Sequence, residues 1–340
     1  MSLLIGGVWL SSVQVSASAE GIHLYNWEEF MSQGVIERFQ AANDVVIFQQ
    51  FFSDESIRDE VILSERGSAF DIVVIESVRL SILAEQGLFH NISDLRDKLK
   101  GNFDKRWLNA CGDYGIPYAW GTTGILYRTD RLEKPTSWAT LYEPKESLSG
   151  RVSMYYEPTD LVGSALLYSQ HDPFTDDIEA LKSVYPILEH QAKHLYSNRY
   201  VVEYISKPNQ LEEIDVAFGY GGDSYALNDV TEGAPWSYAV PKEGTTLWLE
   251  CLAIIQKKEI NPGAIEFVEF LSQPENAAVN AEDSWFSTPV TKARELASEE
   301  YSQDRELFPP QSVMERSFIY KRMTEDALRI RNRMTESLRK

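Results

Sequence analysis

Short apolar runs alternate with segments of helical period along the first part of the chain. The six segments, in order, are 22–25, 34–42, 45–51, 56–64, 70–75 and 80–85. The first, third and fifth have the length of strands, and those between them place apolar residues on one helical face. This rhythm predicts βαβ units, and therefore a parallel sheet with helices on both faces.

Two later apolar runs, 116–124 and 248–255, have proline and glycine in or near them. Such runs suit strands that leave one sheet for another. We therefore predict an α/β fold of two lobes, each a mixed, mostly parallel sheet with flanking helices, and a ligand cleft between the lobes. The expected boundaries are 20–122 with 251–290 for lobe 1 and 123–250 with 291–340 for lobe 2.

The last part of the chain predicts further helices. Asn261 and Pro262 supply an N-cap and a first-turn proline for an amphipathic helix at 264–271. The stretch 313–338 predicts one or two more helices. Its expected apolar face consists of Phe318, Met323, Leu328 and Ile330.

The charge of the chain limits its partners. Among 340 residues, 32 are basic and 52 are acidic, which gives a formal net charge of −20. Such a surface repels phosphate backbones and anionic lipid, so we expect no nucleic acid partner. Cationic ligands would be attracted.

The amino terminus has the pattern of a secretory signal peptide. Residues 1–19 contain no charged residue, carry an apolar segment at 3–10 and end in Ala17-Ser18-Ala19. The missing Lys or Arg before the apolar segment departs from the usual form, and the alternative is a buried first strand. Because no later run reaches the roughly 18 apolar residues of a membrane span, we expect an exported, soluble protein.

Cys111 and Cys251 are the two cysteines of the chain. An oxidising compartment would permit one disulfide between them. Pairing needs Cα atoms within about 7 Å, which the sequence alone does not determine. We favour two buried, inert thiols.

Three motifs place an aromatic ring beside a carboxylate or amide at the end of an apolar run. They are Tyr25-Asn26-Trp27, Tyr220-Gly221-Gly222-Asp223 and Trp248-Leu249-Glu250. Aromatic faces attract ammonium groups, and carboxylates form charge-assisted hydrogen bonds with them. The motifs together predict a receptor for an organic cation of the polyamine class.

The sequence offers little support for catalysis. It has no G-x-S-x-G elbow, phosphate loop or H-E-x-x-H pair, although abundant Asp and Glu leave glycoside hydrolysis open. His190 and His194 share a helical face, but without a third ligand nearby they suggest a solvated surface more than a zinc site. We therefore expect no catalytic residue, no metal and no cofactor.

The chain resembles the periplasmic spermidine/putrescine-binding proteins, two-lobed receptors of ABC transporters, from residue 22 to about residue 310. The resemblance rests on the order and spacing of five motifs. These are Tyr25-Asn26-Trp27, Phe70-Asp71-Ile72-Val73-Val74, Pro117-Tyr118-Ala119-Trp120-Gly121, Pro241-Lys242-Glu243-Gly244 followed by Trp248-Leu249-Glu250, and Ser287-Thr288-Pro289.

The resemblance implies a set of ligand-binding residues. They are Trp27, Glu28, Phe30, Glu76, Glu157, Asp160, Tyr220, Asp223, Trp248, Glu250, Phe286 and Tyr320. Glu28 and Glu76 stand where relatives have small polar residues, which adds acceptors for ammonium groups. Each of these residues also has a structural interpretation. Trp27 and Trp248 could be core residues, and the acidic residues could lie on the surface. Thr159 or Asp160 could cap a helix.

The resemblance also implies a function and partners. Two added carboxylates favour a triamine, spermidine or norspermidine, over putrescine. The expected protein is a periplasmic, monomeric receptor that closes around its ligand and delivers it to an inner-membrane ABC permease. The alternative is a sensor that reports the triamine to a membrane-bound cyclic-di-GMP enzyme controlling biofilm formation.

Overall fold

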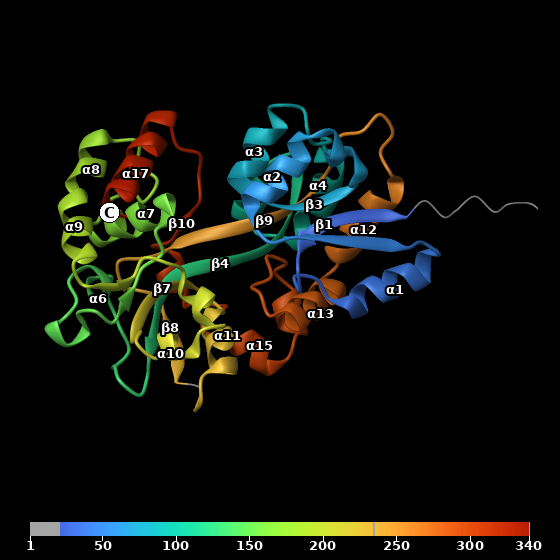
Figure 1. The fold of residues 1–340 in the computed structure, drawn as a ribbon. Coiled ribbons are helices and arrows are strands. Elements are labelled where there is room, and N and C mark those ends of the chain that lie inside the picture. Colours follow the sequence, from blue (N-terminus) through green and yellow to red (C-terminus); the bar gives the residue numbers. More distant parts are fainter. Residues whose placement is uncertain (1–20, 234, 340) are drawn as a thin grey trace, which may run out of the picture.

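The computed structural model describes residues 21–233 and 235–339. Figure 1 shows two bodies of helices around strands, joined by two long strands that run between them. The expected signal peptide at 1–19 lies outside the described residues. Within the described ranges, no helix combines the length and apolar character of a membrane span.

The first lobe begins with the predicted alternation of strands and helices. Its elements are β1 (Ile22–Trp27), α1 (Gln33–Asn43), β2 (Ile47–Phe52), α2 (Glu55–Leu63), β3 (Ile72–Glu76) and α3 (Ser77–Ala84). β1 pairs in parallel with both β2 and β3. The predicted βαβ start is therefore confirmed, and the α/β class with it.

The two predicted crossing segments are the long strands β4 (Gly115–Arg128) and β9 (Thr246–Ile254). They pair antiparallel over the first half of β4, and β9 also pairs with β3. The second half of β4 pairs with β7 (Val216–Tyr220) and β8 (Trp236–Ala239). One continuous strand thus belongs to the sheets of both lobes (Figure 1).

The sheet order is β2-β1-β3-β9-β4-β7-β5-β6, with β10 beside β9 and β8 beside β4. Its outer pairs are parallel and its central pairs antiparallel. The remaining elements are α4 (Ser93–Leu99), α5 (Lys105–Cys111), α6 (Ala139–Tyr142), β5 (Val152–Ser153), α7 (Pro158–Tyr168), α8 (Ile178–Ser183), α9 (Tyr185–Ala192), β6 (Leu195–Ser197), α10 (Pro208–Leu211), α11 (Asp223–Val230), α12 (Pro262–Leu271), α13 (Pro274–Ser284), α14 (Ala293–Leu296), α15 (Glu299–Gln303), α16 (Gln311–Met314), β10 (Phe318–Ile319) and α17 (Glu325–Leu338).

The buried side chains form separate cores in the two bodies. One core gathers buried residues from Ile22 to Trp120 and from Leu247 to Met314, and the others begin at Ile125 and Leu126 on β4. The expected boundaries placed 291–314 in lobe 2, yet Tyr301 and its buried neighbours pack in the first core. We propose that the chain returns to lobe 2 only after Met314.

The expected apolar face at the carboxy terminus is correct for Met323 and Ile330, which pack against the core that begins at Ile125, and wrong for Phe318 and Leu328. The segment forms α16, the short strand β10 and the helix α17. Phe318 and Leu328 are exposed, whereas α17 buries Ala327, Arg331 and Met334. Apolar periodicity did not predict Arg331 on the buried side, because a charged side chain gives no apolar signal.

Cys111 on α5 and Cys251 on β9 form a disulfide, with Cα atoms 6.0 Å apart. Our preference for two inert thiols is therefore wrong. Both cysteines are buried in the first core, where α5 packs against β4 and β9. The bond closes a loop across 140 residues and fixes β9 beside the residues of the candidate site.

Removing the disulfide should lower stability without changing the fold. Closing so long a loop reduces the entropy of the unfolded chain by an amount worth about 4–5 kcal/mol in the loop-closure model. We expect the double variant Cys111→Ala, Cys251→Ala to lose a free energy of unfolding of that order in urea titrations. A reductant should destabilise the parent chain and leave the variant unchanged. Equal urea midpoints for parent and variant would contradict the bond.

Candidate functional site

Trp248 and Glu250 lie two positions apart on β9, and their side chains therefore point to the same side of the strand. The Trp248 ring lies over Gly121 of β4, where a Cβ atom would come within 2.4 Å of the ring. Only glycine leaves room for the tryptophan here. From the end of β1, Nε1 of Trp27 donates a hydrogen bond to Oε1 of Glu250 at 3.4 Å.

Glu250 is a buried carboxylate with a missing partner. The residue is 6% exposed, and its Oε2 has no hydrogen-bond partner among the described residues. Burial raises the pKa of Glu250 to about 8, Arg58 opposes the rise, and the charges of Glu55 and Glu76 add to it. A buried, unpaired carboxylate is costly, so this position favours a bound cation.

Glu76 stands opposite Glu250 in the pairing of β3 with β9. Its carboxylate caps α3 by accepting the backbone N–H groups of Val78 at 2.9 Å and Arg79 at 3.0 Å. It also accepts the hydroxyl of Ser77 at 2.9 Å. Burial raises the pKa of Glu76. Three donors hold this carboxylate at the edge of the site, where it adds negative charge.

The acidic pair of the second lobe lies at the start of α7. Oε2 of Glu157 accepts the backbone N–H of Asp160 at 2.8 Å, so Glu157 is the N-cap. The suggested cap at Thr159 or Asp160 is wrong, because Pro158 occupies the first helical turn. Burial and the neighbouring charge of Asp160 raise the pKa of Glu157 to about 7.

Asp160 is buried beneath two tyrosines. Its Oδ2 accepts the hydroxyl of Tyr220 at 2.5 Å, and its Oδ1 accepts the hydroxyl of Tyr320. Tyr220 ends β7, and Tyr320 follows β10. Burial raises the pKa of Asp160, while the two phenolic hydrogen bonds lower it. Two distant chain segments therefore orient one carboxylate.

Asp223 supports Tyr220 from the start of α11. Its Oδ2 accepts the backbone N–H of Tyr220 at 2.7 Å. Burial raises the pKa of Asp223 to about 6, against a hydrogen bond from Tyr200. Asp223 thus positions an aromatic residue and leaves further negative charge in the cleft.

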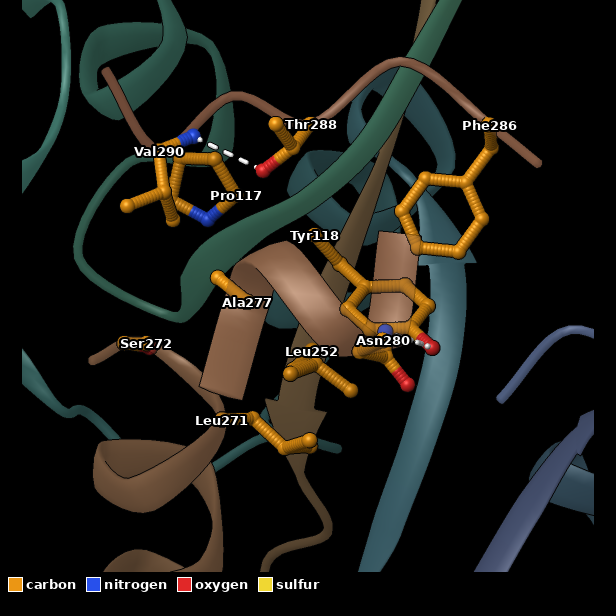
Figure 2. A pocket seen from close by; sticks show the side chains of 10 residues that line it. All are labelled: Pro117, Tyr118, Leu252, Leu271, Ser272, Ala277, Asn280, Phe286, Thr288 and Val290. Carbon is orange, nitrogen blue, oxygen red and sulfur yellow. Dashed lines mark hydrogen bonds between the residues drawn. The ribbon is translucent and has the colours of Figure 1, made fainter. Parts of the chain in front are cut away.

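Phe30 and Phe286 form an aromatic wall, with ring centroids 5.0 Å apart. Figure 2 shows Phe286 beside Tyr118 and Asn280. Tyr118 donates its hydroxyl to the backbone oxygen of Phe30 at 2.5 Å and accepts the amide of Asn280 at 3.1 Å. This network holds the turn after β1, in which Glu28 is exposed.

The structure arranges eleven of the twelve predicted residues in three groups, and the exposed Glu28 lies in none of them. Trp27 and Glu76, at the ends of β1 and β3, meet Glu250 in the middle of β9. Phe30, Trp248 and Phe286 line one cavity. The third group, in the second lobe, consists of Glu157, Asp160, Tyr220, Asp223 and Tyr320.

Glu55 was not predicted from the sequence. It begins α2, directly after β2, and its carboxylate contacts the buried Arg58 at 3.7 Å. Its side chain keeps 55% of its surface exposed, yet its charge raises the pKa of Glu250 in one lobe and of Asp160 in the other. Sequence analysis could have identified Glu55 from its position directly after a parallel strand, because ligands of such folds bind beyond the carboxyl ends of strands.

Two tyrosines of the second lobe were also missed. Tyr155 and Tyr200 lie with ring centroids 5.2 Å apart, and Tyr200 meets Tyr220 edge-on at 5.7 Å. Burial and the charge of Glu157 raise the pKa of Tyr155 to about 12, so it remains a neutral phenol. Its position two residues before Glu157 could have drawn attention to it.

Residues 34–309 match the family of bacterial extracellular solute-binding proteins. The chain is 29% identical over 333 residues to a norspermidine sensor of Vibrio cholerae, covering 97% of this chain and 91% of that protein. It is 27% identical over 295 residues to a spermidine/putrescine-binding periplasmic protein of Escherichia coli, covering 85% and 83%.

A solved structure supports the fold. The substrate-binding protein of a spermidine/putrescine ABC transporter from Streptococcus pneumoniae superimposes with a TM-score of 0.82, at 19% identity, over 95% of this chain and all of that one. Cleft, fold and family match together define a solute-binding protein. The chain belongs to the bacterial extracellular solute-binding protein family.

The raised carboxyl pKa values predict how stability depends on pH without ligand. Glu250, Glu157 and Asp223 bind protons more tightly when folded than when unfolded, so folding takes up protons. The free energy of unfolding should therefore fall as pH rises from about 5 to about 8.

Glu250→Gln should flatten this dependence and stabilise the protein at pH 8.5 by about 1 kcal/mol or more, because the buried charge is gone. Urea unfolding at pH 5.5, 7 and 8.5 measures the effect. Glu266→Gln, at an exposed position of α12, is the control. Equal pH dependence in the parent and Glu250→Gln would contradict the raised pKa.

Proposed function

We propose that this protein is a periplasmic receptor for a polyamine, and that it binds a triamine of the spermidine or norspermidine class more tightly than putrescine. The observation that carries the proposal is the buried, unpartnered Oε2 of Glu250, two residues from Trp248 and hydrogen-bonded through Oε1 to Trp27. An ammonium group of the ligand would donate a charge-assisted hydrogen bond to this Oε2 atom, and the indole faces would cover the adjoining methylene groups.

The second lobe supplies a matching acidic end. Glu157 and Asp160 lie beside the phenols of Tyr220 and Tyr320. A linear polyamine carries cations separated by apolar spacers, so it needs carboxylates at intervals with aromatic surfaces between them. Glu250 in the middle and the acidic pair at one end leave a place for a third cation near Phe30 and Glu28. This spacing supports a triamine over a diamine.

Binding would also favour closure of the lobes. The charge of Glu55 on lobe 1 raises the pKa of Asp160 on lobe 2, so like charges face each other across the cleft. A polycation bound between these carboxylates would attract both of them. It would contact both lobes at once only in the closed form. A ligand shifts a conformational equilibrium by its difference in affinity for the two states. Arg322 and Glu85 already form one ion pair, at 2.6 Å, between the lobes.

The proposed role of the closed form is delivery to an inner-membrane ABC permease. Sensing is the second candidate, favoured by the relative named as a norspermidine sensor, which aligns with 97% of this chain. Deleting the gene distinguishes them. Loss of labelled triamine uptake indicates delivery, whereas unchanged uptake with altered biofilm formation indicates sensing through a membrane enzyme.

Calorimetric titration of residues 20–340 tests the ligand class. After unfolding and refolding to remove carried ligand, spermidine and norspermidine should each bind one-to-one with a Kd of about 1 µM or below, which corresponds to about 8 kcal/mol. Putrescine should bind more weakly, because it lacks one cation. Tighter binding of putrescine would overturn the triamine preference, and no binding of any polyamine would overturn the receptor assignment.

Glu250→Gln should weaken triamine binding by about 1.5–3 kcal/mol, roughly 10- to 150-fold, because a charge-assisted hydrogen bond becomes a neutral one. The fold should persist, since the variant keeps the shape of the side chain. Titration with spermidine and a circular dichroism melt measure both effects, and Glu266→Gln again provides the control. Unchanged affinity would remove Glu250 from the ligand site.

A further inference from the structure

A cavity of about 660 Å³ lies between the two lobes, at the end of the cleft marked by Phe30 and Trp248. This volume is within the range of about 300–1,000 Å³ that is usual for ligand pockets. The cavity continues past the proposed triamine contacts to Trp285 of the first lobe and Tyr225 of the second. None of the proposed triamine ligands accounts for that distal part.

The distal part has the chemistry of an organic cation site. Glu29, Asp229 and Glu300 line it, and within 21–233 and 235–339 no Lys, Arg or His lines the cavity. Among the described residues, these three carboxylates have no ion-pair partner and accept no side-chain hydrogen bond. Their charge is therefore available to a ligand that enters the cavity.

Two aromatic rings give this part a defined wall. Trp285 is the C-cap of α13 and has a left-handed φ of 50°. Its ring meets Tyr301 edge-on at 5.7 Å and Tyr225 of α11 at 6.1 Å. The hydroxyl of Tyr225 donates to Asp304. These contacts fix both rings, one from each lobe.

We propose that the distal part of the cavity binds the terminal ammonium group of a linear tetraamine. In this arrangement three cations would occupy the proposed triamine contacts, and the extra aminopropyl arm would pass Phe30 and lie against the wall formed by Trp285 and Tyr225. Asp229 and Glu300 would then face the fourth cation from opposite lobes. This inference rests on the proposed function, because it extends the same cleft to a longer ligand.

The test compares spermidine with spermine, a linear tetraamine, by calorimetric titration of residues 20–340. The parent protein should bind spermine at least as tightly as spermidine. The double variant Asp229→Asn, Glu300→Gln should weaken spermine binding by about five- to tenfold, the sum of two solvent-accessible ion pairs, and spermidine binding by less than about twofold. The matched control is Glu232→Gln, Glu299→Gln, which removes two nearby exposed charges outside the cavity.

Three results would overturn the inference: weaker binding of spermine than of spermidine by the parent, an equal loss for both ligands in the cavity variant, or an equal loss of spermine affinity in the control. A parent that binds neither ligand would instead refute the proposed function and, with it, the extension. The comparison between ligands therefore separates the two failures.

Discussion

The antiparallel pairing of β4 with β9 joins the two lobes that carry the proposed ligand contacts. β4 belongs to both sheets, so a change in its register would move the two lobes relative to each other. The same pairing places Gly121 under Trp248, where no larger residue would fit. Because side chains alternate along a strand, the register that turns Trp248 toward the cleft also turns the buried Glu250 to the same side. The disulfide from α5 to Cys251 anchors β9 in that register.

Acidic side chains in the cleft make the empty receptor electrostatically unfavourable. Burial raises the pKa values of Glu250, Glu157 and Asp223, and neighbouring carboxylates add to the rise at Glu250 and Glu157. Such a site is stabilised by protons or by a cationic ligand, which compete for the same oxygens. The unfavourable charge is thus part of the proposed recognition, since it penalises neutral and anionic solutes more than any single contact would.

Local elements were predictable because their signals are local. Strand-length apolar runs, helical periodicity and the Asn261–Pro262 start of α12 depend on neighbours a few residues away, and the observed elements follow them closely. Apart from the cap of α7, the predictions that proved wrong involve distant neighbours. Whether Cys111 meets Cys251, and whether Phe318 and Leu328 are buried, depends on contacts between segments that lie far apart in the sequence.

The sequence by itself determined the α/β class, the two crossing strands, the acidic character and the aromatic–acidic motifs. Each of these features depends only on composition or on residues that are close together in the sequence. Only the tertiary structure decided how those motifs meet. It brought Tyr220 and Tyr320 to the two oxygens of Asp160, left Oε2 of Glu250 without a hydrogen-bond partner in the part of the chain that the structure describes, and added Glu55, Tyr155 and Tyr200 to the cleft. Burial and charge coupling depend on which distant segments pack together, and the spacing of residues along a chain does not contain that information.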